Sequence, residues 1–286
     1  MLVGILMALL VAVLTGVRSV YSRVTARETD EYVSSWAVRA FAIPAILIVL
    51  AIDGIPSVQP VFYPLIVLSG TLGTAATILA MRAYKVSDAS LVTPLTALSP
   101  ALVLITEPIL TGNAASPTGI IGVLLLAFGA YFLERGKGEI LEPFRKLAKN
   151  RGVQFMFGVV AIHAITSPVD QLGVNATGAV FWSLTLHLAL TILLMPIMAI
   201  RTDGWQQEVK QAWKPLVFIG VISGLSSVFQ MLAITETLVV YVTGLKRLSI
   251  PLGVVLAHYM FDDEDNLRGR LLGSLIMVVG TVLIVI

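Results

Sequence analysis

The most distinctive chemistry in this sequence belongs to two neighbouring cations inside an apolar stretch. Lys246 and Arg247 lie within residues 239–261, VVYVTGLKRLSIPLGVVLAHYMF, which are long enough to cross a bilayer as a helix. A cation at the centre of a lipid-facing helix costs about 2.5–3.5 kcal/mol on the translocon scale, so two in succession require a protein or water environment. A guanidinium can bind two oxygens of an anion, and an ammonium adds a point charge. The pair therefore predicts the capture of an anionic group.

The residues around this pair indicate what the helix faces. Neighbouring residues on a helix are about 100° apart, so Lys246 shares a stripe with Thr243 and Ser249, and Thr243 also lies on the stripe of Arg247. These stripes are small and polar, whereas the remaining faces carry Val, Leu, Ile and Tyr. We expect this segment to form one wall of a water-filled cavity, with Thr243 and Ser249 among the substrate contacts.

A structural role for the two cations is the alternative, with a carboxylate such as Glu107, Glu236 or Asp170 neutralising them. Glu107 and Asp170 also lie inside apolar segments, where a carboxylate can take up and release a proton during a transport cycle. Both are therefore proton-coupling candidates. For Glu107, a role as counter-ion or at a helix end is equally open.

Further candidate substrate contacts lie on four other apolar segments. Arg39 stands about two turns into the second segment, and its partner is expected on another helix. His163 shares a helical face with Ser167 in the sixth segment, Gln230 belongs to a Ser/Gln face in the eighth, and Thr93 precedes a proline bend in the fourth. Hydrogen bonds between helices and ordinary helix packing are the alternative roles for these polar side chains.

Composition sets the class of protein that positions these residues. Of 286 residues, 57% are hydrophobic and only 13% charged, with a mean hydropathy of +0.92, whereas soluble domains have roughly 25% charge. The net charge of +2 is not gathered into a basic patch, so nucleic acid is not an expected partner. With no cysteine, the chain has no disulfide or thiolate metal site, and no cofactor-binding, metal-binding or catalytic motif is present. We expect no metal and no cofactor.

Ten apolar segments predict an all-α polytopic membrane protein with ten transmembrane helices. Helices are expected because an open strand edge would leave backbone groups unpaired in lipid, and the alternation of a barrel strand is absent. The first segment starts at the N-terminus without a basic lead or a cleavage site, so it counts as a span. The segments are 2–17, 34–52, 61–81, 89–110, 117–133, 152–169, 177–200, 215–234, 239–261 and 271–286.

An internal repeat divides the chain into residues 1–133 and 152–286, joined by a basic linker at 134–151. Five helices in each half is an odd number, so the second half enters the membrane from the opposite side, as an inverted repeat. The repeat is marked by pairs 150 or 151 residues apart: Gly70 and Gly220, Leu98-Ser99 and Leu248-Ser249, Pro100 and Pro251, Gly122 and Gly273, and Gly129 and Gly280.

Loop charge predicts the orientation. The loops after odd-numbered segments hold sixteen Lys and Arg residues, and the loops after even-numbered segments hold none. Because basic short loops stay in the cytoplasm, both termini are expected outside it, in a multi-pass protein of the plasma (inner) membrane. Within the linker, EILEPFRKLAKN has an apolar and a basic face, which fits either a short helix on the inner leaflet or a solvated linker.

Over essentially its whole length the sequence resembles the ten-helix drug/metabolite transporter superfamily, in its EamA-like branch. The matching stretches are SDASLVTPLTALSPALVLITEPILTG with GIIGVLLLAFGAYFL, and VYVTGLKRLSIPLGVVLAHYMFDD with RLLGSLIMVVGTVLI. The resemblance implies two five-helix repeats around a central pocket that opens alternately to either side, and export or exchange of small metabolites.

The sequence departs from this family in two respects. Asn113 stands where relatives carry an acidic residue, and the loop charges oppose the cytoplasmic termini common in the superfamily. The adjacent Lys246 and Arg247 also look like the pair with which plastid triose-phosphate translocators, more distant members, hold phosphate.

The predicted function is that of a secondary transporter moving a small, anionic metabolite by alternating access, as a monomer or homodimer. The alternative is an exporter of amino acids or hydrophobic cations, coupled to protons through a membrane carboxylate. An enzyme is not expected, because a membrane enzyme acting on lipid headgroups would need a clustered His/Asp/Glu site, which is not visible in the sequence.

Overall fold

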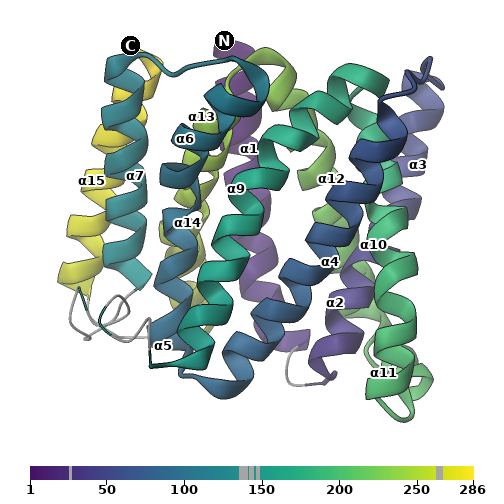
Figure 1. Ribbon diagram of the computed structural model, residues 1–286. Coiled ribbons are helices and arrows are strands. Elements are labelled where there is room, and N and C mark those ends of the chain that lie inside the picture. The colour runs from purple at the N-terminus through teal and green to yellow at the C-terminus, as the bar shows by residue number, and fades with distance from the viewer. Residues whose placement is uncertain (26–27, 135–140, 142–144, 146–148, 262–266) are drawn as a thin grey trace.

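The computed structural model describes residues 1–25, 28–134, 141, 145, 149–261 and 267–286. Within these residues, every assigned secondary-structure element is a helix (Figure 1). In the first half these are α1 (Leu2–Thr25), α2 (Glu31–Ala40), α3 (Ala42–Asp53), α4 (Phe62–Val86), α5 (Ala89–Val92), the 3₁₀ helix η1 (Thr93–Leu98), α6 (Ser99–Thr111) and α7 (Pro117–Glu134). In the second half they are α9 (Arg151–Thr177), α10 (Ala179–Arg201), α11 (Trp205–Gln211), α12 (Trp213–Glu236), α13 (Val239–Leu245), the 3₁₀ helix η2 (Lys246–Leu248), α14 (Ser249–Phe261) and α15 (Leu267–Val285).

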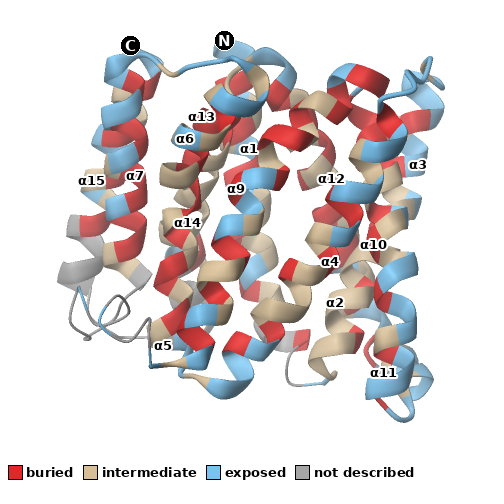
Figure 2. Cartoon of the chain, viewed as in Figure 1, coloured by how far each residue is buried: buried red, intermediate tan, exposed pale blue. Residues whose placement is uncertain are grey.

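The predicted all-α polytopic membrane fold is confirmed. Seven apolar helical stretches are long enough to cross a membrane, and two shorter ones, Pro117–Leu133 and Gly273–Val285, accompany them. The interrupted segment α13–η2–α14 supplies the remaining span of the predicted ten. Large apolar side chains such as Ile48, Ile109 and Ile192 are exposed on the outside of the bundle, where lipid would cover them (Figure 2).

Prolines explain why three of the spans are not single α-helices. A proline has no N–H to give to the carbonyl four residues earlier, which weakens the helix at that point. Pro44 lies just after the break between α2 and α3, and Pro100 and Pro251 lie just after η1 and η2. The expected bend in the fourth segment is therefore present. The ninth segment, expected to be one continuous helix, is instead broken at η2, directly at its two cations.

Two predicted boundaries are wrong for the same reason, namely that helix packing continues past the apolar run. The first helix does not end at Val17 but at Thr25, because its polar end packs along α12, so Arg18 lies inside a helix and not in a loop. The sixth helix is not interrupted at Pro168 but runs on to Thr177. The Thr106 hydroxyl donates to the carbonyl of Ala164 at 2.5 Å, replacing the N–H that Pro168 lacks.

The two halves form the predicted inverted repeats. In Figure 1 both termini lie at the same end of the bundle, α1 runs away from that end, and its counterpart α9 runs towards it. Packing follows the same symmetry, because α1 pairs with α12 and α9 pairs with α4. The four glycines noted in the sequence all lie where α7 and α15 cross, since a Cβ on Gly122 would lie 2.6 Å from the Gly280 oxygen, and one on Gly129 would lie 2.8 Å from the Gly273 oxygen. The absent side chains let α7 and α15 cross closely.

For the central linker, the sequence fits either a short helix on the inner leaflet or a solvated linker. Most of that segment lies outside the described residues.

Candidate functional site

The break in the ninth span positions Lys246. Above it α13 is almost entirely buried, with Val239, Val240 and Leu245 packed between α1, α6 and α7. The chain then turns through η2, whose side chains are half-buried, and Lys246 Nζ donates to Gln230 Oε1 of α12 at 2.7 Å. The structure therefore joins two predicted contacts, Lys246 and Gln230, in one hydrogen bond.

Arg247 points from the same turn towards the first half of the chain. Its Nη1 lies 3.4 Å from Thr96 Oγ1 of η1, and it has other contacts besides. Thr96 lies in η1 and Arg247 in η2, which are the equivalent 3₁₀ turns of the two halves. The two 3₁₀ turns thus face each other at the centre of the inverted repeat.

Helix α9 carries His163 on a face that points towards these cations. Ala161 and Ile165 are exposed on the opposite, apolar side, whereas His163 is exposed and Ser167 half-buried on the polar side. The charges of Lys246, Arg247 and Arg39 all act on His163, so its ring lies within electrostatic range of the central cations. Helix α9 also packs against α4, α6 and α10.

Arg18 is the site residue that the sequence interpretation missed. Its Nη1 donates to Ser223 Oγ of α12 at 3.2 Å, and its charge acts on both Lys246 and Arg39. The signal was present in the sequence, because Thr15, Arg18 and Ser22 continue a polar helical face beyond the apolar run.

Arg39 stands in the last turn of α2, next to the close passage of α12. A Cβ on Gly220 would lie 2.5 Å from the Phe41 side chain, so α12 passes directly beside the break between α2 and α3. Arg39 has no hydrogen bond or ion pair in the described part of the chain, and its side chain is half-buried.

The two carboxylates have different surroundings. Asp170 Oδ1 accepts hydrogen bonds from Ser69 Oγ at 2.9 Å and Trp182 Nε1 at 3.2 Å, and its charge acts on Lys246. Glu107 is only 1% exposed, and its two oxygens each lie 2.8 Å from a backbone amide of α13, those of Val239 and Val240. A carboxylate on these first amides satisfies donors that have no partner within the helix, so Glu107 caps α13 from α6.

The other predicted substrate contacts are Thr243, Thr93 and Ser249. Their side chains form hydrogen bonds with residues nearby in the chain, or form none among the described residues. Thr243 Oγ1 donates to the Val240 carbonyl of its own helix at 3.1 Å, and Thr93 Oγ1 donates to the Tyr84 hydroxyl at 3.4 Å. Ser249 begins α14, and its carbonyl lies against Gly16 of α1.

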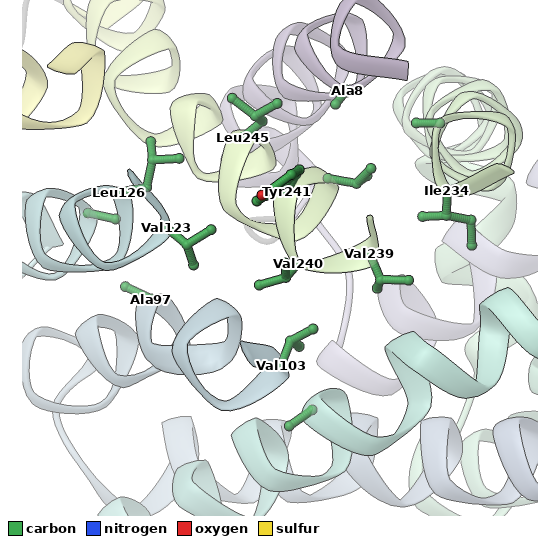
Figure 3. Close-up of a cluster of buried hydrophobic side chains, with 14 of the residues drawn as sticks. Ala8, Ala97, Val103, Val123, Leu126, Ile234, Val239, Val240, Tyr241 and Leu245 are labelled. Carbon is green, nitrogen blue, oxygen red and sulfur yellow. The ribbon is translucent and has the colours of Figure 1, made fainter. Parts of the chain in front are cut away.

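An apolar cluster separates these polar groups from the end of the bundle that holds the termini. Figure 3 shows its centre, where Val239, Val240 and Tyr241 of α13 pack on Val103 and Val123. Polar contacts tie the same region together, since Gln171 Nε2 of α9 donates to the Ile234 carbonyl of α12 at 3.2 Å. Helices α13, α9 and α12 are therefore held together by apolar packing and a hydrogen bond near this end.

Charge is the outstanding property of the central region. Lys246 interacts electrostatically with Arg18, Arg247 and Arg39, and with one carboxylate, Asp170. Lys246 and Arg18 make their hydrogen bonds to the neutral oxygens of Gln230 and Ser223, and neither is in ion-pair contact with a carboxylate among the described residues. No group of three metal-ligating side chains occurs in that part of the chain either. The arrangement suits an anion.

The fold and this polar interior define a multi-pass membrane protein with a charged centre. Residues 2–135 and 150–286 match the EamA-like transporter family, so the chain belongs to that family of membrane transporters for small molecules. The superfamily resemblance of the sequence is thus confirmed.

A solved structure described as "Crystal structure of protein" has the same fold. It aligns with a TM-score of 0.78 at 13% identity, over 99% of this chain and 98% of that one. Among curated proteins, no match to this chain is found.

Proposed function

We propose that this transporter moves a small anionic metabolite by alternating access, with the cargo bound between the two halves beside η2. The observation that carries the proposal is the hydrogen bond of Lys246 to the neutral amide of Gln230, in a region where Arg18, Arg39 and Arg247 add further positive charge. Charges inside a membrane are costly, and cations without a carboxylate partner are stabilised when an anionic ligand binds them.

The inverted repeats supply a route for alternating access. Related helices from the two halves can exchange conformations, so that the bundle opens first at one end and then at the other. The apolar cluster around Val239 and Tyr241 would be the gate at the terminal end, and the exposed His163 lies on the accessible side of it. We therefore assign the structure to the state closed at the termini.

Orientation in the plasma (inner) membrane is also a proposal. The exposed basic side chains Arg82, Lys85, Arg151, Arg201 and Lys210 belong to helix ends opposite the termini (Figure 1). By the positive-inside rule that end is cytoplasmic, and the state described is inward-open.

Transport by the reconstituted full chain tests the anion proposal. Proteoliposomes would be assayed for uptake of radiolabelled phosphate, succinate and pyruvate by the wild type, by Lys246→Gln with Arg247→Gln, and by the exposed-lysine control Lys210→Gln. We expect the double variant to lose at least about 10- to 100-fold of any saturable anion uptake, since each charged contact is worth about 1.5–3 kcal/mol. Unchanged uptake by a correctly folded double variant would contradict the proposal.

Asp170 supports a second candidate, a zwitterion such as an amino acid. Its charge lies within reach of Lys246, and a zwitterion needs both signs in one site. Competition between matched anionic, zwitterionic and cationic compounds distinguishes the two, because Asp170→Asn would weaken only the compounds that carry an ammonium group.

A further inference from the structure

Two of the central cations are anchored on one face of α12. Arg18 of α1 donates to Ser223, and Lys246 of η2 donates to Gln230. These acceptors are seven residues apart, which is two helical turns on nearly the same face and about 10 Å along the helix axis. Helix α12 thus holds an arginine and a lysine from different spans on one face.

The hydroxyl groups between these anchors are engaged elsewhere. Ser226 pairs with Thr15 at 3.3 Å, and Ser227 accepts from Ser183 at 2.8 Å. These contacts tie α12 to α1 and α10, so the positions of the two acceptors are set by packed helices and not by loops.

The charges at the two anchors repel one another. Among the charges that act on Lys246, Arg18 has the largest effect, followed by the adjacent Arg247 and then Arg39. Arg18 and Arg39 also repel each other. Asp170 is the one carboxylate among the charges that act on Lys246, so the group has a clear positive excess. A single negative charge would leave most of this repulsion in place, whereas a divalent anion placed between the anchors would relieve it at both ends.

We propose that the cargo is a small dianion whose two anionic groups bind Arg18 and Lys246. Each anionic group would accept a charge-assisted hydrogen bond from one of the two cations. A short dicarboxylate or a small phosphorylated acid carries two such groups. This inference rests on the proposed function and specifies its substrate class.

Binding by the purified full-length protein tests the dianion. Ligand-induced thermal shifts and counterflow in proteoliposomes would compare malonate, succinate, glutarate and adipate, with butyrate as the four-carbon monoanion and 2-phosphoglycolate as the phosphorylated acid. We expect succinate or 2-phosphoglycolate to bind about 10- to 100-fold more tightly than butyrate, and the dicarboxylate series measures which length the site accepts. Tighter binding of succinate would assign the cargo to the dicarboxylates, and tighter binding of 2-phosphoglycolate would assign it to the phosphorylated acids.

Variants at the two anchors distinguish binding of a dianion by Arg18 and Lys246 from a general attraction of anions to the positive centre. In Arg18→Gln, the affinities for succinate and butyrate should lie within about threefold of each other. Arg18→Lys and the surface control Lys210→Gln should keep a preference for the dianion. If Arg18→Gln does not fold, Ser223→Ala removes the anchor instead and should lower the preference about 3- to 10-fold.

Two results would overturn the dianion. Equal binding of succinate, 2-phosphoglycolate and butyrate by the wild type removes it while leaving an anion transporter, and so does an equal loss for mono- and dianions in Arg18→Gln. If the double variant at Lys246 and Arg247 also transports anions as the wild type does, the proposed function itself fails.

Discussion

Glu107 and Asp170 are both carboxylates inside the bundle, yet their partners suit them to different tasks. Glu107 accepts two backbone amides of α13 and is almost fully buried, so its charge is used at a helix start. Asp170 accepts two side-chain donors through one oxygen and stands within electrostatic reach of Lys246. Of the two proton-coupling candidates, Asp170 is therefore the one whose charge would sense a bound cargo through Lys246. We propose Asp170 for proton coupling.

The cap formed by Glu107 makes a stability prediction. Glu107→Ala leaves the amides of Val239 and Val240 buried without acceptors, and each such group costs about 1–3 kcal/mol. Thermal unfolding in detergent should therefore show a clear loss of stability, whereas Glu236→Ala, at an exposed position, should change little. Equal melting of the two variants would show that the cap contributes no stability.

At the scale of helices, a hydroxyl group from α6 replaces the amide that a proline in α9 lacks. Pro168 would interrupt α9 in isolation, but the Thr106 hydroxyl of α6 occupies the carbonyl of Ala164 that the proline leaves without a donor. The continuity of α9 is thus a property of the α6–α9 contact. Since α9 carries His163 and Asp170 on either side of this point, the contact also sets where those side chains lie.

A double-mutant cycle tests this link between helices. Thr106→Val should destabilise the protein by about 1–3 kcal/mol, because a buried carbonyl loses its donor. In a Pro168→Ala background the restored N–H can bond to Ala164, so the same Thr106→Val change should cost measurably less. Unfolding in detergent measures all four proteins. Strict additivity would mean that Thr106 does not replace the missing amide.

At the scale of the whole molecule, the inverted repeat brings equivalent helices of its two halves together. The glycines of α7 and α15 cross in two related contacts, Gly122 with Gly280 and Gly129 with Gly273. The equivalent turns η1 and η2 meet through Thr96 and Arg247. Both halves therefore contribute to the centre, and the proposed site needs both.

The proposed orientation is tested by labelling, because the chain has no cysteine of its own. Ser57→Cys lies in the exposed α3–α4 connection at the terminal end, and Lys210→Cys lies on α11 at the opposite end. A membrane-impermeant maleimide added to intact cells should label Ser57→Cys and leave Lys210→Cys unlabelled until the cells are opened. The reverse pattern would place the termini in the cytoplasm and make the described state outward-open.

The sequence alone determined the membrane class, the ten spans, the repeat register and the presence of an unusual pair of cations, because hydropathy and spacing are local properties that survive any packing. Tertiary structure alone decided what those cations touch. The pairing of Lys246 with Gln230, the entry of Arg18 into the centre and the use of Glu107 as a cap all join helices far apart in the chain. The partner of a buried charge depends on which helices pack side by side, and hydropathy, which averages over all faces of a helix, carries no information about that choice.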